Sequence, residues 1–332
     1  MNDTRNQATT SKNTLWRVLV SVAIALASSL VVIFYGHRIY DHFAAQAFTP
    51  SSQIAAIHDN LELTKQGSDI LYASQPKLED GQAFNNSCQS AERTAAILGC
   101  YYMRRIYVYD VTNNELAEAE EVTTAHEMLH AAYERLNAFD RDRIDELIDA
   151  EYNRLQGDSK VQQLMEYYKK AEPSALTNEL HSILGTVVAD LSPELEDYYA
   201  RYFTDRQHVV NVNNAYYAVF AEVESEAEEL AARITVLDDQ IKAEKNSYQA
   251  AVDQLKLDIQ AYKSRKYTSN SLAQADARAL NVRVASLESM RQAINTKVGE
   301  LNGLIKQQND LSVRANELNS SINGIVDAEV SL

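Results

Sequence analysis

The spacing of hydrophobic residues is helical over most of the chain and becomes heptad-like in residues 210–332. Two hydrophobic seams flank the polar segment 267–271, which is typical of a turn. We therefore expect an antiparallel coiled-coil hairpin, with pairing between two chains as the alternative. The principal seam positions are Phe220, Ala227, Ile234, Ile241, Tyr248, Leu255 and Tyr262 before the turn, and Leu280, Leu287, Ile294 and Leu301 after it.

A second pattern, near the N-terminus, has no polar face at all. Residues 18–34 carry no charge and are flanked by Trp16 and Tyr35, which predicts a transmembrane signal anchor over residues 18–35. Basic residues are denser before the run than after it, which places residues 1–17 in the cytoplasm and the rest outside. The sequence thus predicts a single-pass protein of the cell membrane. A cleaved secretory signal is the alternative, but the nearest small-residue cleavage motif lies far downstream.

Between these segments, residues 36–209 are expected to form one helical domain with a small β element. Residues 39–63 have the spacing of a helical stalk, and residues 67–76 hold a short apolar run that could form a small strand. Residues 105–111 alternate β-branched and aromatic side chains and give the clearest strand prediction. Residues 139–171 predict amphipathic helix, interrupted near Gly157. The predicted fold class is mainly α.

The composition limits the classes of function that the chain can have. The chain of 332 residues has a net charge of −16, which argues against a nucleic-acid-binding surface. Its nine glycines and four prolines suit a helical protein. Of the two cysteines, Cys88 and Cys100, we expect a single disulfide outside the membrane, with two isolated thiols as the alternative.

The clearest chemical feature is His126-Glu127-Met128-Leu129-His130. Two histidines four residues apart lie one turn apart on the same side of a helix, so both rings can reach one metal ion. Glu127 then lies beside that ion, where it can take a proton from water. The alternative is two surface histidines that share this spacing by chance, but the uncharged neighbours favour a buried helix below a cleft.

This stretch resembles the zincin metallopeptidases. The resemblance implies that His126 and His130 bind one catalytic Zn²⁺ and that Glu127 is the general base. It also implies that a strand just before the helix, here Ile106, Tyr107, Val108 and Tyr109, offers an edge to an extended substrate.

The third zinc ligand defines the subfamily. Asn178-Glu179 resembles the motif of thermolysin-like members, the gluzincins, which implies that Glu179 is this ligand; His181 is the alternative. Those enzymes commonly carry an Asp four residues after the ligand, where this chain has Ile183. Another residue must then steady the first histidine, and Ser182 and Asp190 are the candidates.

The aromatic segment 191–209 supplies candidate donors for the oxyanion, Tyr199 and His208, although aromatic residues at helical spacing more often serve packing. The predicted function is a membrane-anchored, extracytoplasmic zinc metallopeptidase acting on peptides or proteins. The alternative is a non-enzymatic envelope scaffold whose coiled coil is the working part. The coiled coil could bind another envelope protein or a second copy of the chain.

Overall fold

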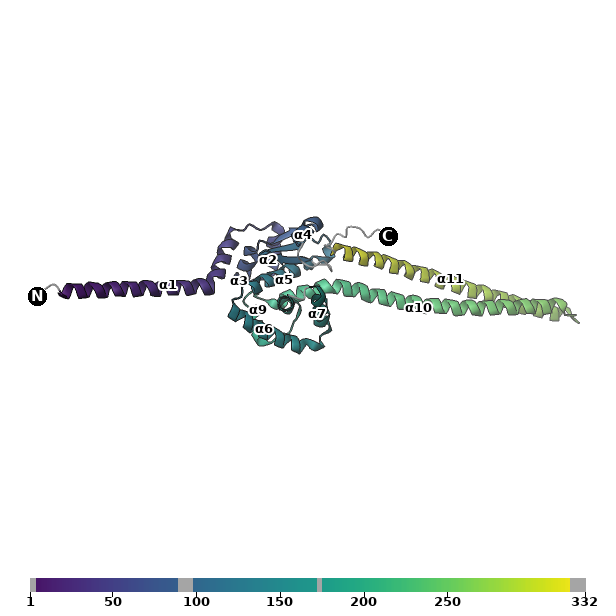
Figure 1. The fold of residues 1–332 in the computed structure, drawn as a ribbon. Helices are drawn as coiled ribbons and strands as arrows, with labels where there is room; N and C mark the ends of the chain where they lie inside the picture. The colour runs from purple at the N-terminus through teal and green to yellow at the C-terminus, as the bar shows by residue number, and fades with distance from the viewer. Residues whose placement is uncertain (1–3, 89–97, 172–174, 323–332) are drawn as a thin grey trace. The chain divides into compact units, whose positions relative to one another are not determined.

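The structure, a computed structural model, describes residues 4–88, 98–171 and 175–322, with the side chains of residues 4–15, 27 and 30–34 left out (Figure 1). The described chain is mainly helical with one three-stranded sheet, which confirms the coarse fold prediction. The longer elements, in chain order, are α1 (Thr4–Ala47), α2 (Ser52–Asn60), α3 (Lys65–Ala73), β1 (Lys77–Glu79), α4 (Gly81–Ser87), β2 (Gly99–Tyr102), β3 (Arg105–Tyr109), α5 (Glu118–Glu134), α6 (Ala138–Arg154), α7 (Ser159–Ala171), α8 (Leu176–Val187), α9 (Pro193–Tyr199), α10 (Arg206–Ser264) and α11 (Asn270–Ser321). Two 3₁₀ turns, Asn114–Leu116 and Leu155–Gly157, precede α5 and α7.

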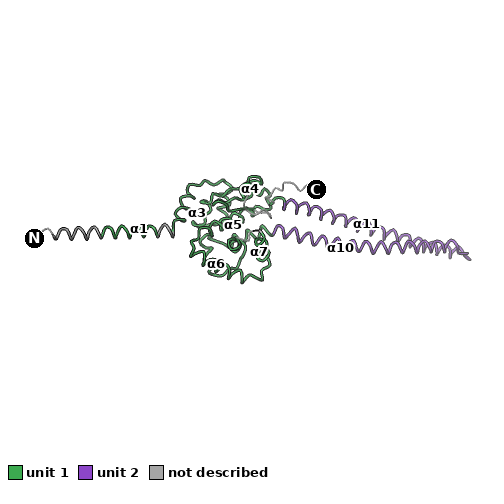
Figure 2. Tube along the Cα trace, viewed as in Figure 1, with its two compact units in different colours: residues 1–217, 320–332 green, residues 218–319 purple. Residues whose placement is uncertain are grey.

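The chain forms two compact units (Figure 2). The first comprises residues 1–217 and 320–332, and the second comprises residues 218–319. Helix α10 is continuous through residue 217, so the division falls within a helix and not in a linker.

Helix α1 contains the segment expected to cross a membrane. Among the described residues, no helix has a stretch both long enough and apolar enough for such a span. Residues 27 and 30–34 of the predicted run lie outside the described side chains. The C-terminal part of α1 packs on the rest of the first unit, where Asp41 pairs at 2.8 Å with Arg135, the residue that follows α5.

The chain between α1 and the sheet differs from two predictions. The helical stalk over residues 39–63 is interrupted, because α1 ends at Ala47 and α2 begins only after Ser51, whose side chain accepts the Ile54 N–H. The prediction of a small strand over residues 67–76 is wrong. Helix α3 occupies most of that stretch, and its N-terminus is capped by Thr64, which accepts the Gly67 N–H at 3.1 Å.

Strand β3 lies at the centre of the sheet, in the order β1-β3-β2. It pairs in parallel with β1 and in antiparallel with β2, so residues 107 and 108 are paired on both sides, while the backbone N–H groups of Tyr109 and Ile106 donate to the carbonyls of Leu98 and Ser74. The strand predicted over residues 105–111 is present over residues 105–109, but the expected role of Ile106, Tyr107, Val108 and Tyr109 as a free substrate edge is wrong. The backbone groups that would pair with a substrate already pair with neighbouring strands.

The alternation of β3 separates two cores. Ile106 and Val108 are buried in the main core of the first unit, whereas Tyr107 and Tyr109 pack against Phe84, Cys88 and Cys100. The main core also draws buried residues from α2, α3, α5, α6, α8 and α9, including Ile57, Leu71, Met128, Leu129, Ile148, Ile183, Leu184 and Tyr199.

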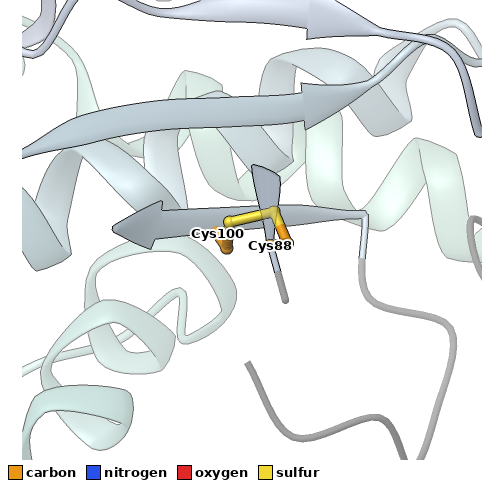
Figure 3. Close-up of a disulfide and its surroundings, with 2 residues drawn as sticks. All are labelled: Cys88 and Cys100. Carbon is orange, nitrogen blue, oxygen red and sulfur yellow. A yellow bond between two sulfur atoms is a disulfide. The ribbon is translucent and has the colours of Figure 1, made fainter. Parts of the chain in front are cut away.

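The predicted disulfide is present between Cys88, just after α4, and Cys100 on β2 (Figure 3). It closes a segment of 12 residues, of which residues 89–97 lie outside the described part of the chain.

In the second unit, α10 and α11 run along each other as the expected hairpin, and the turn between them falls at residues 265–269. Its seam buries Val223, Leu230, Leu237 and Ile241 on α10, with Ile294, Leu304 and Leu311 on α11.

Candidate metal site

Helix α5 brings the two predicted histidines together. Their rings have centroids 4.7 Å apart and planes at 80° to each other. His130 is buried, and the His126 side chain is 16% exposed, so the pair lies at the edge of the core and not on an open surface. Glu127, between them in sequence, is also buried. The alternative, two surface histidines that share this spacing by chance, is therefore excluded.

Helix α8 brings Glu179 to the same place. Its Oε1 lies 3.3 Å from His130 Nε2 and its Oε2 lies 3.5 Å from His126 Nε2. The potential ligand atoms of His126, His130 and Glu179 all lie within 4.8 Å of one another.

These distances suit a shared ion. Ligands about 2.0–2.1 Å from a tetrahedral Zn²⁺ are separated by about 3.3 Å, whereas a charge-assisted hydrogen bond would be about 2.7–2.9 Å long. Two neutral imidazoles and a carboxylate are a donor set that zinc accepts. The residues present fit such an ion, while the identity of a metal is not fixed by this geometry alone.

A close approach between α5 and α8 makes this convergence possible. Gly185 of α8 lies so near α5 that an added Cβ would be 2.3 Å from Leu129 Cδ1 and 2.9 Å from Tyr199 Cε1. Only a residue without a side chain fits there unless its neighbours move. The small residue at this crossing lets the two helices carry Glu179 to the histidines.

His181, the alternative third ligand, points elsewhere. It is fully buried, and its Nε2 lies 2.8 Å from the Tyr198 hydroxyl. Burial and the two neighbouring imidazoles hold the pKa of His181 well below its usual value. Among the described residues it does not belong to the possible metal-binding group. Glu179 and His181 are two residues apart on one helix and therefore face opposite sides.

Ser182, one of the two candidates to steady the first histidine, His126, lies instead beside the second histidine, His130. Its Oγ lies 3.3 Å from His130 Nδ1, the ring nitrogen opposite the one that approaches Glu179. Burial lowers the pKa of His130, which favours the neutral ring that a metal requires. Asp190, the other candidate, offers its backbone carbonyl to Arg154.

The expected oxyanion donors are not brought to this group. Tyr199 is fully buried, and its hydroxyl donates to the His181 carbonyl at 2.7 Å, so the prediction for Tyr199 is wrong. His208 lies in the first turn of α10, where its backbone N–H donates to Asp205. Within the described chain, His208 makes no hydrogen bond, ion pair or ring contact with the histidines of α5.

Sequence reasoning missed Tyr168 of α7. Its ring lies parallel to that of His126, with centroids 6.5 Å apart. Burial and the nearby carboxylates of Glu179 and Glu127 raise the pKa of Tyr168 well above 10, so its hydroxyl stays protonated. The sequence signal was only an aromatic pair, Tyr167-Tyr168, on an amphipathic helix, which resembles ordinary packing.

Strand β2 was also missed, and it lies directly against Glu127. An added Cβ on Gly99 would be 2.4 Å from Thr123 Cγ2 and 2.8 Å from Glu127 Cγ. In the described chain β2 is an edge strand, and it is joined to β3 through Met103 and Arg104, which both have positive φ. Two residues with positive φ are typical of a tight hairpin turn. Such turns usually contain Asn or Gly at these positions, so the sequence Met103-Arg104 did not predict a turn.

Comparisons with protein-family models, with curated proteins and with solved structures found no match.

Proposed function

We propose that the chain is a zinc-dependent peptidase whose metal ligands are His126, His130 and Glu179. The observation that carries the proposal is the approach of Glu179, 49 residues along the chain from His130, to both imidazoles. A catalytic zinc needs three protein ligands and an open position, and this group offers three. Glu127, on the same turn of α5, supplies an acid–base group beside them.

When bound, zinc polarises the scissile carbonyl and lowers the pKa of water. Glu127 takes a proton from the attacking water and passes it to the leaving amine. Tyr168, whose ring lies 6.5 Å from that of His126, would donate a hydrogen bond to the oxygen that gains negative charge. Ser182 holds the ring of His130 in the orientation that presents Nε2 to the ion.

A peptide is the substrate class that best suits the surroundings. Among the described residues, one side of β2 is unpaired, and the Gly99 end of this strand lies against Glu127. An extended peptide that pairs with β2 would place its backbone carbonyls beside the general base. The substrate edge that the resemblance implies is thus proposed for β2 and not for β3.

We propose that the metal site faces an oxidising compartment outside the cytoplasm. The disulfide between Cys88 and Cys100 supports this location, because such bonds are rare among reduced cytosolic proteins. The anchor over residues 18–35 remains a prediction from the sequence. Treating intact cells with a membrane-impermeant protease should remove residues after the anchor; complete protection in intact cells, with cleavage after lysis, would contradict the location.

The test of the function combines metal content with cleavage of a peptide library by the purified full chain. Glu127→Gln should keep about one zinc per chain and lower the rate of peptide cleavage by about 10²–10⁴-fold, the usual contribution of a general base. Glu179→Gln should lose the zinc. Glu118→Gln, which removes a carboxylate from the first turn of the same helix, is the matched control and should behave as wild type.

His181→Gln separates the two candidate ligands. It should keep the metal, because His181 faces Tyr198. Loss of zinc in this variant but not in Glu179→Gln would overturn the ligand set. Wild-type protein that holds one zinc yet cleaves no peptide would favour the envelope-scaffold alternative.

A further inference from the structure

A pocket of about 800 Å³ lies beside α1 in the first unit. Its walls come from α1, α3, the junction of α5 and α6, and the residues that follow α9. The volume is within the range of pockets that hold small ligands, about 300–1,000 Å³. None of the proposed metal ligands lines this pocket, so it is separate from the candidate metal site.

Four of the charged side chains that line the pocket neutralise one another. Arg135 pairs with Asp41 at 2.8 Å, and Lys65 pairs with Asp69 at 2.7 Å. These two ion pairs add no net charge to the pocket, and they leave neither lysine nor arginine of the pairs free for a ligand.

Two further arginines of the lining keep their charge. Within the described chain, neither Arg38 nor Arg201 makes an ion pair. The third acid of the described lining, Asp140, accepts a hydrogen bond from Asn137 at 2.7 Å in the first turn of α6. The lining therefore carries a net positive charge in a chain whose net charge is −16. An anion is the class of ligand that such a pocket attracts.

The two free arginines come from distant parts of the chain and approach the same tyrosine. Arg38 is on α1, and Arg201 follows α9. Burial raises the pKa of Tyr202, which also lines the pocket, and the positive charges of Arg201 and Arg38 both oppose this rise. Both guanidinium groups therefore lie close to the Tyr202 side chain, on one side of the pocket.

We propose that this pocket binds a phosphate group, which Arg38 and Arg201 hold. A guanidinium group is a planar fork that donates two parallel hydrogen bonds to phosphate oxygens. A phosphate group has oxygens on several sides and can accept from two such forks at once. A carboxylate suits the pair less well, because one fork already engages both of its oxygens.

A phospholipid headgroup is the source of phosphate that the location favours. Tyr35, the last residue of the predicted anchor, lines the pocket and is 53% exposed. Tyrosine is enriched at the level of the lipid headgroups, so the predicted anchor places this end of the pocket at that level. Arg38 is three residues further along α1, where it can reach a lipid phosphate. The lipid source rests on the predicted anchor, whereas the phosphate site does not, and neither depends on the metal site.

The test uses the full chain in micelles of a neutral detergent and three probes. Native mass spectrometry counts bound phosphatidylglycerol and bound diacylglycerol, which has the same acyl chains but no phosphate. Isothermal titration calorimetry measures the binding of inorganic phosphate. We expect phosphatidylglycerol to bind, diacylglycerol not to bind, and inorganic phosphate to bind more weakly than the lipid. Inorganic phosphate that binds as tightly as phosphatidylglycerol would support the phosphate site and identify free phosphate as its ligand.

Variants of the two arginines locate the binding. Arg38→Gln and Arg201→Gln should each weaken phosphatidylglycerol binding by about tenfold or more, because each removes hydrogen bonds to a charged group. The side chain of Arg38 is exposed, so Arg38→Gln should leave the thermal unfolding temperature unchanged, which separates lost binding from a folding defect. Arg278→Gln is the matched control, since Arg278 is an exposed arginine of α11 outside the pocket, and it should bind as wild type.

Two results would overturn the proposal. One is equal binding of phosphatidylglycerol and diacylglycerol, or no binding of either phosphatidylglycerol or inorganic phosphate. The other is phosphatidylglycerol binding that neither Arg38→Gln nor Arg201→Gln changes.

Discussion

The ion pair between Arg135 and Asp41 should be among the strongest stabilising contacts of the first unit. Arg135 follows the last residue of α5, and its Nε lies 2.8 Å from Asp41 Oδ2. Its guanidinium also donates to the Ala131 carbonyl at 2.8 Å, and to the hydroxyls of Tyr101 and Ser74, both at 3.2 Å. The Arg135 and Asp41 side chains are only 5% and 4% exposed, so salt does not screen the pair appreciably. Arg135 thus ties α1 to the end of the helix that carries the histidines.

Arg135→Met should lower the free energy of unfolding by about 3–5 kcal/mol. Most of this cost arises because the variant leaves the Asp41 carboxyl group buried without its cationic partner. The double variant Arg135→Met with Asp41→Leu removes that unpaired carboxyl group and should recover at least about 2 kcal/mol. The Lys65→Met control breaks the Lys65–Asp69 pair, whose lysine side chain is 72% exposed, and should change stability by about 0.5 kcal/mol or less.

The assay is urea unfolding followed by near-ultraviolet circular dichroism, which reports on the packed tyrosines Tyr198, Tyr199 and Tyr202 of this unit. Each variant is measured at low salt and at high salt. A loss below about 1 kcal/mol for Arg135→Met would show that the pair is not an important buried contact. If the destabilisation of the double variant equals the sum of those of Arg135→Met and Asp41→Leu measured singly, the coupling between Arg135 and Asp41 is refuted.

Two further predictions concern packing and charge around α5. Glu120→Gln should stabilise the protein above pH 7 and leave its stability unchanged near pH 4. Burial, together with Asp110 nearby, raises the pKa of Glu120 from 4.5 to about 7, so the folded state holds a proton that the unfolded state releases, and stability falls as pH rises between these values. The gain, measured by urea unfolding across pH, should be at most about 3 kcal/mol, and equal stability of variant and wild type at pH 8 would contradict it. Gly185→Ala should cost about 1–3 kcal/mol and weaken zinc binding, because its Cβ would overlap Leu129 and push α8 from α5. The control is Gly303→Ala on α11, where nothing lies within 4 Å of the new Cβ; it should stabilise the protein by up to about 1 kcal/mol. Both variants are measured by thermal unfolding and zinc titration. Equal effects of the two substitutions would refute the close-contact argument.

Local patterns were sufficient for the features that one helix or strand contains. The hairpin of α10 and α11, the histidine spacing on α5 and the alternation of β3 all depend on periods of 3.5, 3.6 and 2 residues, which the sequence displays directly. The disulfide was also predictable, because only two cysteines are present and they lie close in sequence.

Short or atypical segments were misjudged for local reasons. The apolar run at residues 70–72 does not distinguish a strand from a short helix, and its burial on the main core selects helix α3. Strand β2 escaped notice because its turn to β3 uses Met103 and Arg104 instead of the usual Asn and Gly.

By itself, the sequence determined the helical class, the hairpin and the two histidines with their glutamate, because each is set by contacts within a few turns of one element. Tertiary structure alone decided that Glu179 and not His181 approaches the histidines, that Tyr168 lies beside them, and that β3 is central in the sheet. Those outcomes depend on how closely α5 and α8 approach at Gly185 and on which strands pair. Packing between distant segments has no period in the sequence, so only the folded chain reveals it.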